Sequence, residues 1–401
     1  MGRLNQVADA WPSNVDKHSV DGELPVRLCN YTDVYKNPAI VEGMNFMAAT
    51  ASPEQIERFR LEVGDTVITK DSETSDDIGI PAFVEYAAHD LICGYHLSIV
   101  RPNRAEADPK FIYWALSSRP TMDQWAVLAS GVTRVGIKSG DLSKVAIPLP
   151  SVEEQRSIAD YLDRETSRID TLIEEQQRLI EMLRERREAT IRRALTAGID
   201  GADTVPSGVE LLGPIPKNWR VVPTRHLCTI TTGSEDSGNA TDDGDFPFYV
   251  RGRAVLRSDT YSFDGEAVMT PGDGQGGTGK VFHYYNGKFE AHQRVYVFKD
   301  FVEVTGLYFY YFLSTFLRPI ALAGSNTVTM ESLRRPLLAD FKVAVPPVDE
   351  QRRIAAYIDE QTTKVDQLIA ETERFIELSK ERRVALITAA VTGQIDVREM
   401  A

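Results

Sequence analysis

The sequence has few cysteines, no excess of basic residues and no long apolar run. Its 401 residues include 3 Cys at widely separated positions, which excludes a disulfide framework and favours a reducing cytoplasm. The formal net charge is −14, which excludes a protein that holds nucleic acid through bulk positive charge. The most apolar stretch, Gly306 to Phe316, is too short and too rich in Tyr to span a bilayer. We therefore expect a cytoplasmic protein with no membrane partner.

Sequence motifs for catalysis are also missing. The Asn/Asp-Pro-Pro-aromatic motif of amino-methyltransferases is absent. The Pro-Asp…Glu-x-Lys motif of common nucleases is absent too, because no Pro-Asp occurs in the sequence. The six His residues do not have the spacing of metal ligands. The run Gly274-Gln-Gly-Gly-Thr-Gly-Lys280 fits part of a phosphate-binding loop. However, Val281 and a strand pattern follow it, where a nucleotide-binding loop needs Ser or Thr and a helix. The run is therefore interpreted either as a turn whose amides and Lys280 contact a phosphate group or as a plain surface turn, and no enzyme is predicted.

The main positive feature is an internal repeat. Residues 150–200 and 346–396 align without a gap at an offset of 196 residues, with about half of the positions identical. The length predicts two or more domains, and 42% hydrophobic with 26% charged residues is typical of a globular protein. A duplicated segment of this length needs an explanation in the architecture.

Each repeat is predicted to form one long helix. Proline precedes each copy, acidic residues occupy the first turn, and neither copy contains Pro or Gly again until Gly198 and Gly393. Apolar residues alternate at spacings of three and four, which is typical of a coiled-coil seam. The expected seam residues are Ile158, Leu162, Ile169, Leu172, Leu179, Leu183, Ile354, Ile358, Val365, Leu368 and Phe375. Neither helix can bury this stripe alone, so we expect the two helices to pack on each other.

Two non-helical regions of similar length accompany the helices. Strand-like runs occur in both, and Asn286-Gly287 predicts a two-residue hairpin between Val281–Tyr285 and Phe289–Phe298. Each region also has one aromatic-rich helical segment, near Phe111 to Ser117 and Leu307 to Phe316. The chain is thus predicted to alternate a globular domain and a long helix, twice.

Several runs resemble a known family. They are Arg27-Leu-Cys-Asn-Tyr-Thr-Asp-Val-Tyr-Lys-Asn37, Gly64-Asp-Thr-Val-Ile-Thr-Lys-Asp-Ser-Glu73 and the twice-used Pro-x-x-Glu-Gln-x-x-Ile-Ala. Together with the double layout, they resemble the specificity subunit of a type I restriction–modification system. The resemblance covers essentially the whole chain, and the repeated Glu-Gln-Arg-x-Ile-Ala helix start is its most specific part.

The resemblance implies an α+β protein in which two mixed α/β target recognition domains alternate with two long helices that pair as an antiparallel coiled coil. Each domain would recognise one half of a split, asymmetric DNA site, and the helices would space the two halves. The implied segments are target recognition domain 1 (1–149), spacer helix 1 (150–197), a linker (198–216), target recognition domain 2 (217–345), spacer helix 2 (346–393) and a C-terminal tail (394–401).

The resemblance also implies partners. Besides double-stranded DNA, they are two methyltransferase subunits, which modify adenine at N6 with S-adenosylmethionine, and restriction/translocase subunits that use ATP and Mg. This subunit itself would hold no cofactor and no metal and would have no catalytic activity.

Base recognition needs hydrogen-bonding side chains on exposed loops that reach the major groove. The candidate DNA-binding residues are Lys70, Arg101, Arg104, Arg134 and Lys138 in the first domain, and Arg251, Arg253, Arg257, Lys280 and Arg294 in the second. We expect most of each set to line one face of its domain.

Two charged clusters near the ends of the helices are candidates for binding partner subunits or the DNA backbone, although a solvated coiled-coil flank explains them equally well. They comprise Glu185, Arg186, Arg187, Glu381, Arg382 and Arg383. Gln155 and Gln351, at the helix starts, are expected to cap the first turn.

A second hypothesis stays open. The negative charge throughout the chain also fits a coiled-coil scaffold, or a degenerate relative, whose globular domains bind proteins. Absent or salt-independent DNA binding would favour this scaffold, because phosphate contacts weaken steeply with salt.

Overall fold

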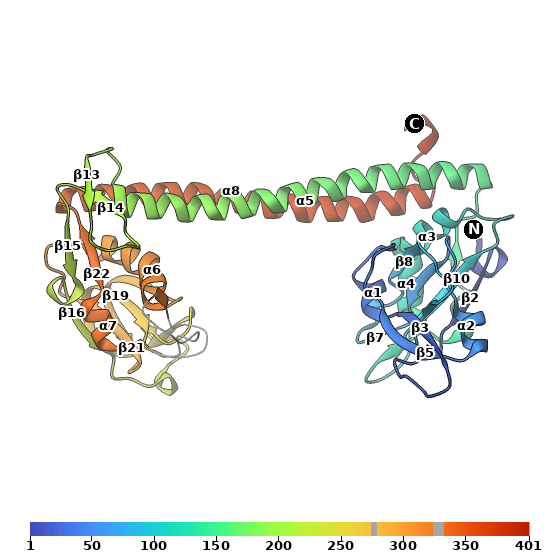
Figure 1. The fold of residues 1–401 in the computed structure, drawn as a ribbon, viewed down its shortest axis with the longest axis horizontal. Helices are drawn as coiled ribbons and strands as arrows, with labels where there is room; N and C mark the ends of the chain where they lie inside the picture. Colours follow the sequence, from blue (N-terminus) through green and yellow to red (C-terminus); the bar gives the residue numbers. More distant parts are fainter. Residues whose placement is uncertain (274–278, 324–332, 401) are drawn as a thin grey trace. The chain divides into compact units, whose positions relative to one another are not determined.

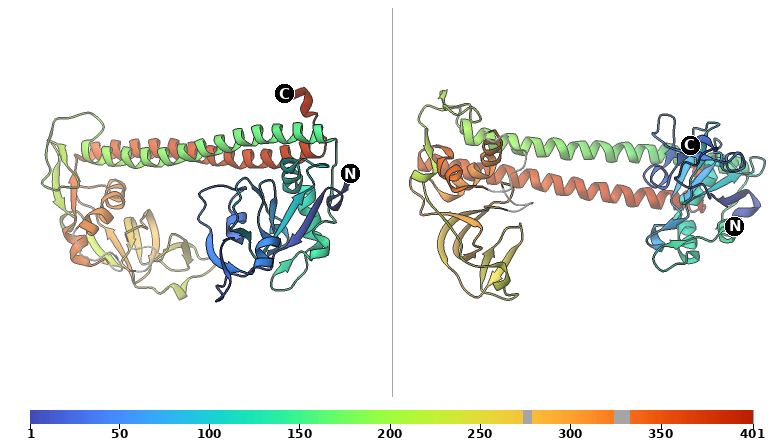
Figure 2. Two further views of the ribbon diagram at one scale, coloured as in Figure 1. Left: turned by 45° about the vertical axis from the view of Figure 1, so that its right-hand side comes forward. Right: turned by 60° about the horizontal axis from the view of Figure 1, so that its bottom comes forward.

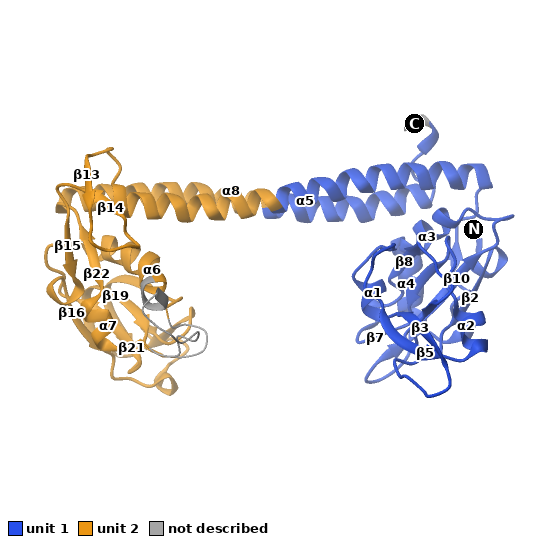
Figure 3. Ribbon diagram, in the orientation of Figure 1, with its two compact units in different colours: residues 1–177, 373–401 blue, residues 178–372 orange. Residues whose placement is uncertain are grey.

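The chain forms two compact units, each of which contains part of both long helices. The computed structural model describes residues 1–273, 279–323 and 333–400. Unit 1 comprises Met1–Gln177 and Glu373–Ala401, and unit 2 comprises Arg178–Thr372 (Figure 3). The compact units therefore cut across the helices, whereas the linear segment boundaries given above stay a prediction.

The two expected long helices are present. Helix α5 spans Val152–Ala197 and helix α8 spans Val348–Val391 (Figure 1). The first turn of each helix has two acidic residues, which favour the positive end of the helix dipole. Gly198 and Gly393 follow with φ of 69° and 73°, the left-handed conformation in which helices commonly end. With 46 residues, α5 has a length of roughly 70 Å.

Within each unit, α5 and α8 pack in antiparallel fashion. In unit 1 the Arg383 Nε atom lies 2.9 Å from Asp170 Oδ1, so the early part of α5 meets the late part of α8. In unit 2 the Arg187 Nε atom lies 2.9 Å from Asp366 Oδ1, which joins the late part of α5 to the early part of α8. These two ion pairs occupy equivalent positions of the repeat. The predicted pairing of the helices is confirmed.

The seam of α8 differs from its prediction. Leu368 and Phe375, both expected in the seam, are 49% and 44% exposed, and this part of the prediction is wrong. Thr362, Thr372 and Ser379 are buried instead, and each hydroxyl donates to the carbonyl oxygen four residues earlier. Because its own helix satisfies each hydroxyl, a small polar residue can be buried here at low cost. Apolarity alone does not identify such positions.

A buried glutamine at the start of each long helix connects the helix to its globular part. Gln155 accepts from the backbone N–H of Asp108 at 2.9 Å, and Gln351 accepts from that of Thr305 at 2.8 Å. Each side-chain NH₂ donates to the proline carbonyl five residues earlier, and that of Gln351 also donates to the carbonyl of Glu303. These bonds connect the helix to the globular part and do not cap its first turn, so the expected capping role is corrected to a joint that occurs in both units.

The same joint contains an aromatic helix in each unit. Helix α3 (Pro109–Ser117) and helix α6 (Gly306–Ala323) lie at the two expected aromatic segments. Trp114 Nε1 of α3 donates to Asp163 of α5 at 2.8 Å, and the Tyr311 hydroxyl of α6 donates to the equivalent Asp359 of α8. Burial, followed by this hydrogen bond, raises the pKa of Tyr311.

Within the described ranges, no helix combines the length and hydropathy needed to cross a membrane.

Unit 1 is built on a mixed five-stranded sheet. Asp108 caps α3 by accepting from Phe111 N, and α3 buries most of its surface in the core between the sheet and α5. The sheet order is β2 (Ala8–Pro12), β10 (Leu97–Pro102), β6 (Thr66–Thr69), β8 (Pro81–Val84) and β4 (Ala39–Ile40). A three-stranded sheet contains β5 (Met47–Ala51), β3 (Leu24–Cys29) and β9 (Leu91–Cys93), and two strand pairs are β1 (Gly2–Arg3) with β12 (Ala146–Ile147) and β7 (Asp71–Ser72) with β11 (Val135–Gly136). The remaining helices are α1 (Tyr31–Tyr35), α2 (Pro53–Phe59) and α4 (Arg119–Leu128).

In the described part of unit 2, the main sheet has six strands and is covered by α6. Phe309, Phe312 and Phe316 of α6 are fully buried in a core shared with both long helices. The sheet, in yellow and orange, can be followed in both views of Figure 2. Its order is β16 (Thr229–Thr232), β21 (Val295–Lys299), β19 (Phe263–Pro271), β20 (His283–Ala291), β17 (Phe246–Tyr249) and β18 (Val255–Ser258). Two strand pairs are β13 (Thr204–Pro206) with β14 (Pro214–Pro216) and β15 (Arg220–Pro223) with β22 (Lys342–Val345), and α7 spans Arg335–Asp340.

The hairpin predicted at Asn286-Gly287 is wrong. β20 runs through both residues, and Gly287 lies directly opposite Gly265 in the antiparallel pair of β19 and β20. Both glycines have positive φ, 145° and 119°, so they provide a local distortion of two long strands and not a turn. The connection between these strands includes residues 274–278, which lie outside the described residues. They make up most of the Gly-rich run, so the turn predicted there also lies outside the described residues. The described residue Lys280 follows them and lies three residues before the start of β20.

Candidate nucleic-acid interface

Two of the predicted cations of unit 1 meet in one polar cluster. The pairing of β7 with β11 makes Gly136 the register partner of Asp71, and Arg134, two residues before Gly136, lines the same pocket as Asp71. Asp71 Oδ2 lies 2.6 Å from Lys70 Nζ and 2.9 Å from His96 Nδ1, and Arg134 Nη1 lies 3.5 Å from His96 Nε2. The cluster thus presents cationic and anionic groups side by side.

A shallow pocket of about 360 Å³ adjoins this cluster. Tyr31 and Tyr35, one turn apart on α1, stack with ring centroids 5.3 Å apart, and the Tyr35 hydroxyl donates to Asp77 at 2.9 Å. Arg134, His96 and Asp71 complete one side of the pocket. Flat aromatic faces next to hydrogen-bond donors and acceptors are the groups that contact bases.

Arg101 does not belong to this cluster. Its guanidinium bonds Asp65 at two oxygens (2.8 and 2.7 Å) and Glu62 at 2.7 Å, and it lies 5.3 Å from the centre of the Trp11 ring. Burial raises the pKa of Asp65, while the hydrogen bonds from Arg101 oppose that rise. Arg101 therefore has a structural partner for its charge inside unit 1.

The two other predicted cations of unit 1 also lie apart from the cluster. Arg104 donates to the backbone carbonyl of Val63, in the turn before β6. Lys138 is exposed two residues after β11, at the start of a short 3₁₀ turn (Ser139–Asp141). The structure therefore brings together Lys70 and Arg134 of the five predicted residues.

In unit 2, Arg251 and Arg294 share one carboxylate. Arg294 Nη1 lies 2.9 Å from Asp273 Oδ2, and Arg251 Nη1 lies 3.8 Å from Asp273 Oδ1. The buried His292 lies beside them, and its pKa is lowered by burial and then by Arg251. The three charged residues follow β17, follow β19 and precede β21, so the ends of three strands of one sheet create the cluster.

Arg253 and Lys280 lie in a second place, a groove of about 710 Å³ that we call the basic groove. It is lined by Arg187, Glu188, Ile191, Arg192, Arg253, Gly279, Lys280, Phe282, Tyr310, Ser314, Thr315, Arg318 and Pro319. Arg257 is separate from both places, because its guanidinium donates to the carbonyls of Gly244 (2.8 Å) and Asp245 (3.2 Å) and so supports the β17–β18 hairpin.

The charged clusters of the long helices have mixed roles. Arg187 and Arg383 form the ion pairs between α5 and α8 described above. The other members, Glu185, Arg186, Glu381 and Arg382, are exposed. An internal partner for the two arginines could have been inferred from the sequence, since Asp170 and Asp366 also occupy equivalent repeat positions.

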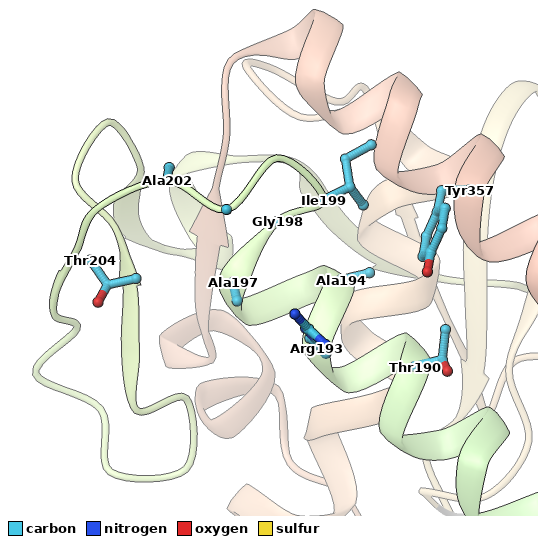
Figure 4. Close-up of a pocket in the computed structure, with 10 residues that line it drawn as sticks. Thr190, Arg193, Ala194, Ala197, Gly198, Ile199, Ala202, Thr204 and Tyr357 are labelled. Atoms are coloured by element: carbon cyan, nitrogen blue, oxygen red, sulfur yellow. The ribbon is translucent and has the colours of Figure 1, made fainter.

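Another pocket, of about 400 Å³, lies where α5 ends (Figure 4). Arg193 and Thr190 of α5 and Tyr357 of α8 line one part of it, and the segment with Ala202 and Thr204 lines another. Arg193 is the one charged lining residue among the described residues. Most of the lining is small and apolar, so this pocket offers no catalytic constellation.

Several residues of both surfaces were not predicted from the sequence. In unit 1 they are Tyr31, Tyr35 and Asp77, and in unit 2 they are Arg192 and Arg318. The spacing of Tyr31 and Tyr35 by four residues would have indicated a shared helix face. Arg192 and Arg318 lie on helices that were assigned to the spacer and the core, so their part in a groove depends on how α5 and α6 pack.

Comparison with known proteins identifies the class of protein. The family model of type I restriction–modification DNA specificity domains matches residues 27–182 and again residues 216–377. The two matches cover more than half of the chain, one in each half of the sequence. The chain belongs to this family.

Its curated relatives are subunits of restriction enzymes. The specificity subunit of the type I restriction enzyme EcoDI from Escherichia coli is 30% identical over 183 residues, which are 46% of this chain and 40% of that protein. The putative type I restriction enzyme MjaX specificity subunit from Methanocaldococcus jannaschii is 23% identical over 361 residues, 86% of this chain and 81% of that protein. The chain thus matches under half of the first relative and most of the second.

Solved structures share the fold. An HsdS subunit from Thermoanaerobacter tengcongensis is 18% identical, with a TM-score of 0.59 over 98% of this chain and 96% of that one. A chain from a structural study of assembly and conformational transition of the type I restriction–modification system is 19% identical, with a TM-score of 0.69 over 97% and 96%. At these identities, the likeness supports the fold alone.

Proposed function

We propose that this chain is the sequence-recognition subunit of a type I restriction–modification complex and that each unit recognises one half of a split, asymmetric DNA site. The observation that carries the proposal is the contrast inside the repeat. The joint between globular part and long helix is built on equivalent residues of α5 and α8 in both units, whereas the sheets and polar surfaces attached to it differ. Two different recognition surfaces, joined to the long helices in equivalent ways, fit a DNA site whose two halves have different sequences.

The candidate contacts in each unit follow from this proposal. In unit 1, Lys70, Arg134 and the adjoining tyrosine pocket are the groups for base recognition, and Lys138 is exposed beyond β11. In unit 2, Arg251 and Arg294 have this role. Paired donors and acceptors are suited to base edges in the major groove. Arg101, Arg104 and Arg257 support the domains instead, because they lie apart from these clusters and donate to the buried Asp65 or to backbone carbonyls.

Partner subunits complete the proposed function. Two methyltransferase subunits that use S-adenosylmethionine would dock on the long helices and methylate adenine at N6, and restriction subunits that use ATP and Mg would cleave unmodified DNA. This chain would hold no cofactor and catalyse no step. Exposed Met182, Leu368, Phe375 and Leu378 on α5 and α8 support a docking role for the helices, since large apolar groups in water favour association.

Mapping of N6-methyladenine in the host genome, with and without this gene, tests the proposal. Deletion is expected to abolish methylation at one split, asymmetric motif and to leave all other motifs unchanged. A host in which this gene is active but deletion changes no methylated motif would contradict the proposal. The coiled-coil scaffold would then be favoured, and it predicts that the assembled complex binds DNA weakly and without dependence on salt.

A further inference from the structure

The basic groove of unit 2 carries a concentration of positive charge in an acidic protein. Among its described lining residues, five are Lys or Arg and one is Glu, while the whole chain has a net charge of −14. The cations come from four separate places: helix α5, helix α6, the loop between β17 and β18, and the connection between β19 and β20. They are Arg187, Arg192, Arg253, Lys280 and Arg318. The fold therefore gathers cations that are far apart in the sequence.

The contribution of α5 to the groove is specific to this copy of the repeat. At the equivalent positions of α8, Thr388 replaces Arg192 and Val384 replaces Glu188. Only Arg187 has a cationic counterpart, Arg383, and those two arginines form the ion pairs between the helices. Pairing of the long helices thus does not explain Arg192.

The groove has the groups that bind a phosphodiester. Arg192 lies 5.2 Å from the centre of the Phe316 ring, which holds its guanidinium over α6. The Tyr310, Ser314 and Thr315 side chains add hydroxyls along the same wall. Arginine and lysine together with hydroxyls are the usual partners of DNA phosphate oxygens.

The groove is also continuous with the proposed base-contacting surface of unit 2. Arg253, in the groove, is separated from Arg251 by Gly252 alone, and the Gly252 carbonyl lies 3.3 Å from His283 Nε2 at the start of β20. A DNA strand bound at Arg251 would therefore have the groove next to it. This continuity favours DNA over an acidic protein as the occupant.

We propose that the basic groove binds the DNA backbone beside the half-site of unit 2. The C-terminal part of α5 would then contact phosphate, whereas the equivalent part of α8, in unit 1, would not. This inference rests on the proposed function and deepens it. A phosphate contact adds affinity without base selectivity, so the recognised motif should not depend on Arg192 or Arg318.

The test uses the chain assembled with its methyltransferase subunits. The affinity for a duplex with the mapped motif and for a scrambled duplex is measured over a range of salt concentrations. Arg192→Gln and Arg318→Gln should each weaken binding to both duplexes by about the same factor, roughly 3- to 10-fold, and lower the salt slope by about 1. Arg193→Gln, one residue along α5 and in the other pocket, should change neither quantity.

Further variants keep the result interpretable. Arg192→Lys retains the charge, so it should retain the salt slope even if the packing on Phe316 is weakened. An unchanged slope and affinity in both Gln variants would overturn the groove proposal. Loss of a partner subunit at unchanged DNA affinity would overturn it in favour of a protein occupant. If the wild-type complex does not distinguish the two duplexes, the proposed function itself fails, whereas the slopes still decide the groove.

Discussion

The two units are alike in their long helices and where a globular part meets those helices, and they differ in the globular parts themselves. Gln155 and Gln351 bridge equivalent backbone positions, and Trp114 and Tyr311 bond equivalent aspartates. By contrast, unit 1 has a five-stranded sheet and a tyrosine pocket, whereas the described part of unit 2 has a six-stranded sheet and a basic groove. Attachment and recognition are thus separate properties of each unit, and a duplicated attachment can carry different surfaces.

Exchange of a whole domain should have the largest effect on this comparison. Replacement of residues 1–149 by the corresponding domain of another family member is expected to change one half of the methylated motif and to leave the other half intact. Methylation mapping of the host with the chimaera measures both halves together. A change in both halves would contradict independent recognition by the two units.

Removal of the joint glutamines should have the next largest effect. Gln351→Ala leaves two backbone partners of the globular part, at Thr305 and Glu303, without their bond, whereas Gln155→Ala leaves one, at Asp108. An unsatisfied buried group costs about 1–3 kcal/mol, so we expect the free energy of unfolding to fall more for Gln351→Ala than for Gln155→Ala.

Thermal or denaturant unfolding of the full chain in its complex measures this difference, and amide hydrogen exchange locates it at α3 or α6. The exposed residues Gln177 and Gln367 provide matched controls on the same helices. If the joint and control substitutions lowered the free energy of unfolding equally, the hydrogen bonds of Gln155 and Gln351 would not stabilise the units.

Acid should destabilise unit 2 through two histidines. Burial is the first cause that lowers the pKa of His283 and of His292 from 6.5. Near pH 6.5 the histidines of the unfolded chain therefore bind protons, whereas those of folded unit 2 stay neutral. Their contribution to the free energy of unfolding is complete above pH 6.5 and is lost as the pH falls from that value toward the lower pKa of the folded unit.

Unfolding measured at pH 8 and at pH 5.5 checks this expectation. The double variant His283→Gln/His292→Asn keeps a hydrogen-bonding group at each position and should flatten the dependence of unit 2 on pH. An equally steep dependence in the double variant would show that other groups cause it.

The ion pairs between the long helices should have the smallest effect. Both are partly exposed, so double-mutant cycles of Arg187 with Asp366 and of Arg383 with Asp170 should give coupling energies of about 0.5–1 kcal/mol. Arg383→Gln is expected to cost slightly more than Arg187→Gln, because Arg383 also lies 5.9 Å from the centre of the Trp114 ring. A larger loss of stability for Arg187→Gln than for Arg383→Gln would contradict this prediction.

Periodicity and repetition made the architecture predictable. The spacing of apolar residues and the ungapped repeat predicted two long paired helices, and the aromatic runs predicted α3 and α6. The errors occurred where one local signal has two structural outcomes. Asn286-Gly287 distorts a strand and does not close a hairpin, and Thr372 is buried in the seam while Phe375 is exposed.

The sequence by itself determined the duplicated helices, their acidic starts and the family resemblance, because these depend on local spacing along one chain. Only the tertiary structure decided which cations act together. His96 contacts both Arg134 and Asp71, and one groove brings Arg192 of α5 near the loop residues Arg253 and Lys280. It also showed that Arg101 is held by the buried Asp65. A charge has the same identity in a salt bridge and in a groove, and its surroundings after folding determine what it can bind.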